Sequence, residues 1–184
     1  MKGSLSACAL ALALFAPAGS AIAAKSDSCA HCHGTDGNST SSAYPSLAGQ
    51  PREYLYRQIK AFKEGSRKNS MMSTAVVVLS DQDAQDLAEY FSGQTLARST
   101  AKTDPATIEQ GKKIAAEIQC VACHQPNFKG LNEFPRLSRQ KYPYLVKQLK
   151  DFRDGTRVND VMGPTVKNLT DEQIDALAQY LTNL

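Results

Sequence analysis

The sequence predicts an all-α protein built from two similar helical units. Apolar residues recur at helical spacing, as in Leu55-Ile59-Phe62, and no segment alternates apolar and polar residues as a half-buried strand does. One short motif and its neighbours appear twice along the chain. The 184 residues carry 21% charged and 42% hydrophobic side chains, the composition of a soluble globular protein. This composition excludes a disordered chain or a bundle of membrane helices, and a formal charge of +3 does not indicate nucleic-acid binding.

The first 24 residues follow the three-part pattern of a secretory signal peptide. Lys2 precedes an Ala/Leu-rich apolar run over residues 5–15, and small residues at 21–23 offer a cleavage site. The run is much shorter than the roughly 20 residues that a membrane-spanning helix needs. We therefore predict that residues 1–24 are removed and that the mature chain is exported across a membrane. Removal takes away Cys8 and leaves four cysteines.

The mature chain is a tandem repeat. A Cys-x-x-Cys-His motif begins at Cys29 and again at Cys120, an offset of 91 residues. Other residues recur at an offset of 90, because the loop after the motif is one residue longer in the first unit. The matching pairs are Pro45/Pro135, Tyr54/Tyr144, Gln58/Gln148, Phe62/Phe152, Gly65/Gly155, Arg67/Arg157, Asn69/Asn159 and Met72/Met162. We predict two domains, residues 25–94 and 104–184, joined by a polar linker at 95–103.

The helix before the motif differs between the two units. In the second unit Asp104 is a helix N-cap, Pro105 is the first helical residue, and apolar residues continue at helical spacing to Ile118. In the first unit only about five residues lie between the predicted cleavage site and Cys29. We expect this helix to be stunted or missing in the first domain, and that domain to be the less stable one.

The later helices are common to both units. A central helix carries an apolar stripe in each, and Gly65 and Gly155 end these helices as C-cap residues. Ser80 and Thr170 open the last helix of each unit with a capping signature. Units of about 80 residues bury only a small hydrophobic core, so each is expected to need a disulfide, a metal or a large bound group.

The Cys-x-x-Cys-His motif is the attachment signature of c-type haem. Each thiol forms a thioether to a haem vinyl group, and the adjacent histidine is the proximal iron ligand. The alternatives are zinc sites, thioredoxin-like redox pairs and structural disulfides. The two pairs lie too far apart for a zinc ribbon, a βαβ context is absent, and a disulfide between adjacent turns constrains little chain. The motif therefore predicts haem attachment at Cys29, Cys32, Cys120 and Cys123 and iron ligation by His33 and His124. His31 is interpreted as a variable residue within the motif.

The ligand on the other side of each iron decides between electron transfer and binding of small molecules. Met72 and Met162 lie at matching distances after the two motif histidines, on a segment between two predicted helices, and the repeat alignment selects Met72 over Met71. A methionine in such a place can also be a core residue. We predict that Met72 and Met162 bind iron, because they occupy equivalent positions outside the apolar stripes. A thioether ligand raises the reduction potential.

Each unit resembles a class I cytochrome c domain, and the pair resembles the dihaem cytochrome c4 family. The resemblance rests on the two haem motifs, the two methionines, Leu-Ala-Gly-Gln at 47–50 and Asp-Phe-Arg-Asp-Gly-Thr-Arg at 151–157, and it covers nearly all of residues 25–184. It implies two low-spin haems, with His33/Met72 and His124/Met162 as the axial pairs.

The resemblance also implies the surroundings of the haems. The carbonyls of Pro45 and Pro135 are expected to accept a hydrogen bond from Nδ1 of the ligand histidines, which fixes the imidazole rings. Leu47 and Leu137 are expected to pack on the porphyrin faces.

The function that the resemblance implies is electron transport in the bacterial periplasm, typically toward a terminal oxidase and without catalysis. The expected partners are redox proteins such as a membrane oxidase or a dehydrogenase, and not nucleic acid, with peripheral membrane association left open. One alternative is the cytochrome subunit of a periplasmic dehydrogenase of the flavocytochrome type. Another is a dihaem enzyme such as a peroxidase or a thiosulfate dehydrogenase, which needs an open iron site that this pattern does not supply.

Charge is unevenly divided between the units. Residues 25–94 carry 7 basic and 8 acidic side chains, and residues 95–184 carry 13 and 10. The excess in the second unit is either a solvated surface or a docking surface for an acidic partner. A further hypothesis pairs Arg67 and Arg157 with haem propionates across the domain interface. The residues that supply much of the basic character are Lys129, Arg136, Arg139, Lys141, Lys147 and Lys150.

Overall fold

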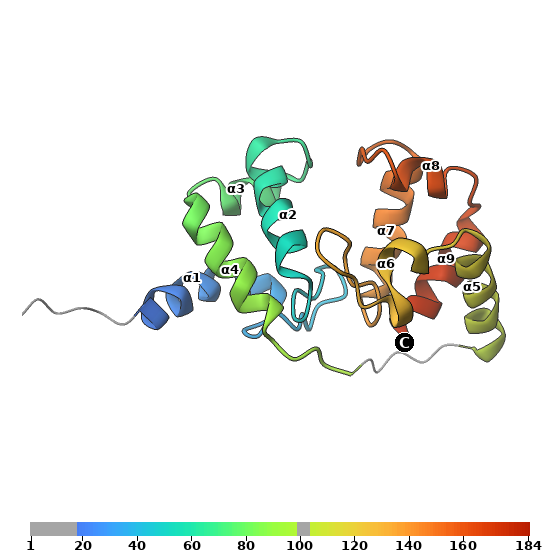
Figure 1. Ribbon diagram of the computed structural model, residues 1–184, viewed down its shortest axis with the longest axis horizontal. Coiled ribbons are helices and arrows are strands. Elements are labelled where there is room, and N and C mark those ends of the chain that lie inside the picture. The colour runs from blue at the N-terminus through green and yellow to red at the C-terminus, as the bar shows by residue number, and fades with distance from the viewer. Residues whose placement is uncertain (1–17, 99–103) are drawn as a thin grey trace, which may run out of the picture.

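The computed structural model describes residues 18–98, the first half, and residues 104–184, the second half (Figure 1). Most of the predicted signal peptide (1–17) and part of the predicted linker (99–103) lie outside the described residues. Within the two described ranges the regular elements are helices, with one isolated β-bridge between Leu131 and Phe134. The predicted all-α class is confirmed. No helix in these ranges is long and apolar enough to cross a membrane.

The first half contains a helix that ends with the motif and three later helices. They are α1 (Ala18–His33), α2 (Arg52–Glu64), α3 (Ser70–Val76) and α4 (Asp81–Ser92). The predicted boundaries are present: α2 ends at Gly65, which has a φ of 78°, and Ser80 and Asp83 form a capping box at the start of α4. Helix α1 contains the motif at its C-terminal end, and only residues 25–28 lie between the predicted cleavage site and Cys29, so the helix before the first motif is short, as expected.

The second half repeats this arrangement with a longer helix before the motif. Its elements are α5 (Pro105–Glu117), α6 (Val121–His124), the 3-10 helix η1 (Pro126–Phe128), α7 (Tyr142–Arg153), α8 (Met162–Val166) and α9 (Asp171–Thr182). Asp104 caps α5 by accepting a hydrogen bond from the Thr107 amide at 3.0 Å, and Thr170 and Gln173 form the capping box of α9. Helix α7 ends at Arg153 with Asp154 as its C-cap, so Gly155, at a φ of 77°, lies one residue beyond the predicted cap position. The predicted starts of α5 and α9 are therefore present.

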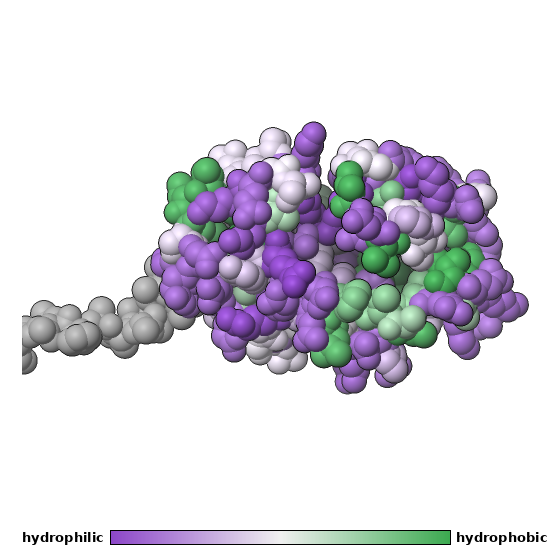
Figure 2. Space-filling view, turned by 45° about the horizontal axis from the view of Figure 1, so that its top comes forward, coloured by the Kyte–Doolittle hydropathy of each residue, from purple (hydrophilic) through white to green (hydrophobic). Residues whose placement is uncertain are grey.

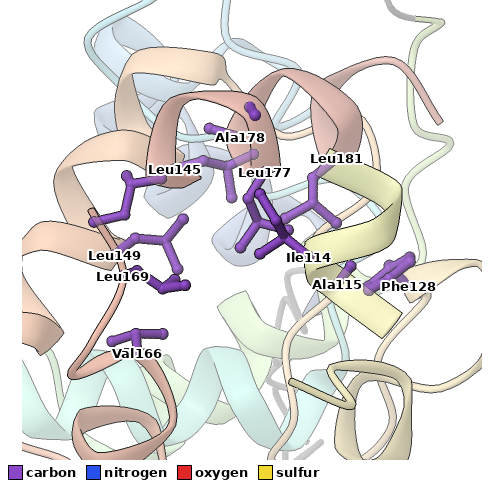
Figure 3. Close-up of a cluster of buried hydrophobic side chains, with 12 residues drawn as sticks. Ile114, Ala115, Phe128, Leu145, Leu149, Val166, Leu169, Leu177, Ala178 and Leu181 are labelled. Carbon is purple, nitrogen blue, oxygen red and sulfur yellow. The ribbon is translucent and has the colours of Figure 1, made fainter. Parts of the chain in front are cut away.

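The second half has the larger hydrophobic core (Figure 3). Helix α5 lies directly against α9, because Gly111 has no side chain: a Cβ atom there would be 2.2 Å from the backbone oxygen of Ala176. Ile114 of α5 meets Leu177 of α9 beside this contact. The same buried cluster extends to α7 through Leu145 and reaches α8. This close packing fixes the helix that precedes the second motif.

The first half has a smaller core between α2 and α4. Its fully buried cluster, among the described residues, consists of Leu55, Leu87, Ala88 and Phe91. Cys29 of α1 packs against the edge of this cluster. The two halves therefore share a helix arrangement, and they differ in how much of it is held together by side-chain packing alone.

The halves lie side by side, with α2 and α7 on their facing sides (Figure 1). Gln50 binds the backbone of Arg136 twice: its Nε2 donates to the carbonyl at 2.8 Å and its Oε1 accepts from the amide at 2.9 Å. Gln140 binds the backbone of Ser46 in the same way, at 2.9 and 2.8 Å. Since 46 and 50 correspond to 136 and 140 in the repeat, an approximate twofold axis relates the two halves.

A second reciprocal set of hydrogen bonds joins the halves. Arg67 donates to Gln58 in its own half at 2.6 Å and to Gln148 in the other half at 2.7 Å. Arg157 donates to Gln148 at 2.6 Å and to Gln58 at 2.8 Å. Arg67 also donates to the hydroxyl of Tyr144 at 2.9 Å. The arginines that repeat in the sequence thus lie at the interface, while their pairing with haem propionates stays a prediction.

Candidate functional site

His33 lies at the last residue of α1 and faces inward. It is 7% exposed, and its Nδ1 is 2.9 Å from the carbonyl oxygen of Pro45. A carbonyl only accepts, so Nδ1 carries the proton and the lone pair is on Nε2, where a metal can bind. Burial lowers the pKa of His33, which the hydrogen bond to Pro45 only partly offsets. The imidazole is therefore neutral at neutral pH, as a metal ligand must be.

His124 has the same environment in the second half. It ends α6, is 5% exposed, and its Nδ1 is 2.8 Å from the carbonyl oxygen of Pro135. Burial lowers its pKa as well. The expected hydrogen bonds from both motif histidines to proline carbonyls are confirmed. The second imidazole thus also leaves Nε2 free.

The four cysteines of the motifs, Cys29, Cys32, Cys120 and Cys123, are free thiols of intermediate burial. Burial raises the pKa of Cys29 and raises that of Cys120 to about 11. Redox-active cysteine pairs have lowered thiol pKa values, so these pairs are poor candidates for thioredoxin-like chemistry. Within the described ranges, no group of three or more His, Cys, Asp and Glu side chains is arranged to hold a metal ion, which weighs against the zinc alternative.

Met72 lies in α3 and Met162 begins α8, so each methionine is on a short helix and not on the predicted segment between helices. The amide of Met72 donates to the side chain of Asn69 at 2.9 Å, and that of Met162 donates to Asn159 at 2.8 Å. Both methionines are half-buried, whereas Met71 is 59% exposed. The repeated asparagine therefore fixes the backbone of each candidate ligand, and the selection of Met72 over Met71 agrees with their burial.

The other highlighted residues have different surroundings. His31 is exposed, in agreement with its interpretation as a variable residue. Arg136 is only 4% exposed and does not contribute to a basic surface, so its inclusion among the basic surface residues is wrong. It is buried because its backbone and side chain both bond to the first half. Lys129, Arg139 and Lys147 are exposed as expected.

Exposed apolar residues occur near the two methionine segments. Val77 and Val78 are 58% and 83% exposed after α3, and Val158 and Val161 are 78% and 55% exposed before α8. On the face shown in Figure 2, apolar side chains lie in small separate patches among hydrophilic ones. This face therefore carries no continuous apolar band.

Apart from the two arginines, the side chains that join the two halves were not predicted from the sequence. Gln50 and Gln140 bind backbone across the interface, and Tyr54 and Tyr144 lie with the two arginines. Burial raises the pKa of Tyr54, but Arg157 and other nearby donors outweigh it and lower the pKa overall. The sequence signal for these contacts is the recurrence of polar residues at a fixed offset outside the helix caps. A polar residue on a free surface has less need to be kept in both units.

The residues present fit a haem c group in each half. Each half offers two free thiols one turn apart, a buried neutral imidazole with Nε2 free, and a half-buried methionine on a capped turn. A haem attached by thioethers and bound by a histidine and a methionine needs these donors. The arrangement is suited to a closed iron site that exchanges electrons.

Comparison with known proteins agrees with this arrangement. The family model for cytochrome c matches twice, at residues 16–94 and 108–184. Cytochrome c4 of Pseudomonas aeruginosa is 39% identical over 174 residues, which cover 88% of this chain and 86% of that protein. The crystal structure of reduced recombinant cytochrome c4 from Pseudomonas stutzeri has a TM-score of 0.84 and 38% identity, and the match covers 92% of this chain and 100% of that one. This chain belongs to the cytochrome c4 family.

Membership establishes the cofactor and the general function. The chain carries two covalently bound haem c groups and transfers electrons, as dihaem cytochromes of this family do. Another relative, from Thiomonas intermedia, is named a thiosulfate dehydrogenase electron acceptor; it is 34% identical over 170 residues, covering 84% of this chain and 77% of that protein. Both kinds of relative exchange electrons with other proteins, so redox partners are a property of this family.

Proposed function

We propose that each half binds one haem through its own motif. Cys29 and Cys32 attach the first haem, and His33 and Met72 bind its iron. The observation that carries this assignment is the pair of buried histidines with Nδ1 on a proline carbonyl, at 2.9 and 2.8 Å.

The second half repeats the assignment. Cys120 and Cys123 attach the second haem, with His124 and Met162 as axial ligands. The domains are residues 25–94 and 104–184, joined by the linker at 95–103, and each contains a complete set of ligands.

The residues of the chain hold each iron in a state suited to electron transfer. When bound, the haem iron supplies the change between ferric and ferrous states. The prolines orient the imidazoles, and Asn69 and Asn159 accept hydrogen bonds from the methionine amides, so the chain would hold both ligands in fixed positions. The methionine thioether favours the ferrous state and raises the potential. Two strong ligands on each iron leave no position for a substrate, so we propose a carrier without catalytic activity.

We propose that the carrier works in the periplasm after removal of residues 1–24, passing electrons between redox proteins and toward a terminal oxidase. The signal-peptide pattern of the N-terminus supports export. A second candidate is the electron acceptor of a periplasmic dehydrogenase, which is favoured by the name of the Thiomonas intermedia relative. The two differ in their electron donor and use the same haem sites.

Absorption spectra of methionine variants test the ligand assignment. The purified dihaem protein is expected to show two low-spin haems that do not bind carbon monoxide. Met72→Ala and Met162→Ala should each open one iron, so that one haem per molecule binds the gas. Met71→Ala is the matched control, since this neighbour of Met72 is 59% exposed, and it should behave as the unmodified protein. Carbon monoxide binding by the unmodified protein, or by Met71→Ala alone, would contradict the proposal.

A further inference from the structure

Arg136 breaks the approximate twofold symmetry of the interface. Gln50 binds its backbone just as Gln140 binds the backbone of Ser46, so positions 136 and 46 correspond. Their side chains differ: Ser46 is small and neutral, whereas Arg136 carries a guanidinium. The interface thus contains a positive charge on one side that has no counterpart at the equivalent position on the other.

The guanidinium of Arg136 is buried between the two halves. One terminal nitrogen donates to the carbonyl of Ala48 in the first half at 3.0 Å, and the other donates to the carbonyl of Ser138. Its Nε is buried without a hydrogen-bond partner. Among the described residues no carboxylate pairs with this side chain, and the charged group that acts on it is another cation, Arg139. Among the described residues the guanidinium therefore bonds only to neutral carbonyl groups.

Burial lowers the pKa of Arg136 to about 10, with a smaller contribution from Arg139. The group still carries its full charge at neutral pH. A buried charge acts more strongly on its surroundings than an exposed one, since the effective dielectric constant is lower and dissolved salt screens it less.

Arg136 connects the two loops that carry the proline partners of the motif histidines. It directly follows Pro135, whose carbonyl oxygen is 2.8 Å from Nδ1 of His124. Across the interface it bonds to Ala48, three residues after Pro45, whose carbonyl binds the other motif histidine. The guanidinium charge is therefore held close to the loops that orient the motif histidines of both halves.

We propose that Arg136 sets the reduction potentials, because its buried positive charge favours the reduced state of the haem irons. Reduction adds one electron to an iron, and a fixed positive charge nearby lowers the free energy of that state. Ser46 at the equivalent position makes no such contribution. The proposal rests on the haem sites assigned above. Arg136 does not bind iron in this proposal; it acts on the irons only through its charge.

The midpoint potentials of the dihaem protein test this proposal. In Arg136→Gln, spectroelectrochemical titration should show a fall of about tenfold in the equilibrium constant for reduction of at least one haem, which is about 59 mV for one electron. Arg136→Lys keeps the charge and should stay within about threefold of the unmodified protein. Arg139→Gln removes a charge from the exposed surface of the same loop and should also stay within about threefold. The fall in Arg136→Gln should persist at high salt, because the site is buried.

Unchanged potentials in Arg136→Gln, with both haems still low-spin, would overturn the proposal. An equal fall in Arg136→Lys would also overturn it, since the effect would then come from the lost contacts and not from the charge. Should Arg136→Gln not assemble, Arg136→Ser introduces the residue that the first half already has at this position, and the same fall is expected. Carbon monoxide binding by the unmodified protein would refute the axial ligands instead, so the two failures are distinguishable.

Discussion

The two halves share their site residues and differ in the packing that supports them. In the second half α5 crosses α9 in close contact at Gly111, and a cluster of twelve buried hydrophobic residues surrounds the crossing. In the first half the cluster has four such residues, and an ion pair between Lys25 and Asp83 connects α1 to α4. The thiols, histidines and methionines need fixed positions relative to one haem, whereas the core can be filled in several ways. Site geometry is therefore repeated more closely than packing.

The loops after the motifs show the same contrast. Gly34 and Gly37 have φ values of 83° and 76°, and the equivalent residues Gln125 and Phe128 have 67° and 54°. A left-handed backbone is unfavourable for a residue with a side chain. The second half keeps this conformation without glycine, which indicates that its larger core holds the loop in place. The first half uses residues that adopt it freely.

The largest effect is expected from Gly111→Ala. The new Cβ would meet the backbone oxygen of Ala176, so α5 and α9 must separate, at a cost of about 3 kcal/mol in the free energy of unfolding of the second half. Native-state hydrogen exchange in the dihaem protein reports α4 and α9 separately. In the unmodified protein α9 should be the better protected helix, and Gly111→Ala should reduce or reverse that difference.

The control for this prediction is Gly93→Ala at the end of α4. The nearest atoms to a Cβ there are 3.7 Å away, so the change should cost less than about 1 kcal/mol. Better protection of α4 than of α9 in the unmodified protein would contradict the view that the first half is the less stable one.

Two interface variants test the symmetry of the contact. Gln50→Ala and Gln140→Ala each remove two hydrogen bonds to the opposite half and should each cost about 2 kcal/mol of interaction between the halves. The measurement is the temperature at which each half unfolds, since weaker coupling separates the two transitions. The control is Gln82→Ala, which removes a hydrogen bond to Asp86 on the exposed face of α4. It should leave the two unfolding transitions together. If one variant weakened the interaction between the halves clearly more than the other, the two symmetric contacts would not be energetically equivalent.

The smallest effect is expected from acid on the capping boxes. The box of α4 closes on the carboxylate of Asp83 and that of α9 on the neutral amide of Gln173. Hydrogen bonds from Lys25 and Ser80 lower the pKa of Asp83 to about 2. Because the pKa in the folded state lies below its unfolded value of about 3.9, this contribution is complete above about pH 4 and is lost as the pH falls through about 2.

The first half should therefore lose protection of α4 between pH 4 and 2. The loss at α9 should be smaller, because its capping box contains no carboxylate, although hydrogen bonds from its own backbone and from Thr170 lower the pKa of Glu172 in the same turn. Asp83→Asn should remove this pH dependence, and Gln173→Glu should introduce a weaker one in the second half, which has no residue equivalent to Lys25 in its capping box. Hydrogen exchange of the first-turn amides over this pH range is the measurement. Equal acid sensitivity of both caps in the unmodified protein would contradict the assignment.

The sequence predicted those features that depend on local patterns. The caps at Ser80, Thr170 and Asp104 and the stop at Gly65 follow from side-chain chemistry within one turn, and all four are present. The motif histidines and their proline partners lie within a dozen residues of each other, and these contacts are confirmed. Haem attachment and axial ligation stay proposals, because they require the cofactor.

The interface was not predictable in the same way. Arg136 and Gln50 are polar residues on loops, and their sequence surroundings are those of exposed positions. Each becomes buried only because its half meets a copy of the same loop, and hydrophobic periodicity carries no information about such meetings. That residues 25–33 form a helix containing the first motif was also not predictable, because nine residues are short for an independent helix.

The reciprocal glutamine contacts have the geometry of a symmetric homodimer interface contained in one chain. In a dimer of this kind each copy presents the same patch to the other, and the association depends on concentration. Linking the two copies makes the encounter intramolecular, with an effective concentration in the millimolar range for a short connection. A modest set of hydrogen bonds then keeps the halves paired at any dilution. Both haems therefore reach a redox partner in the same encounter. Two separate one-haem proteins would have to meet that partner independently.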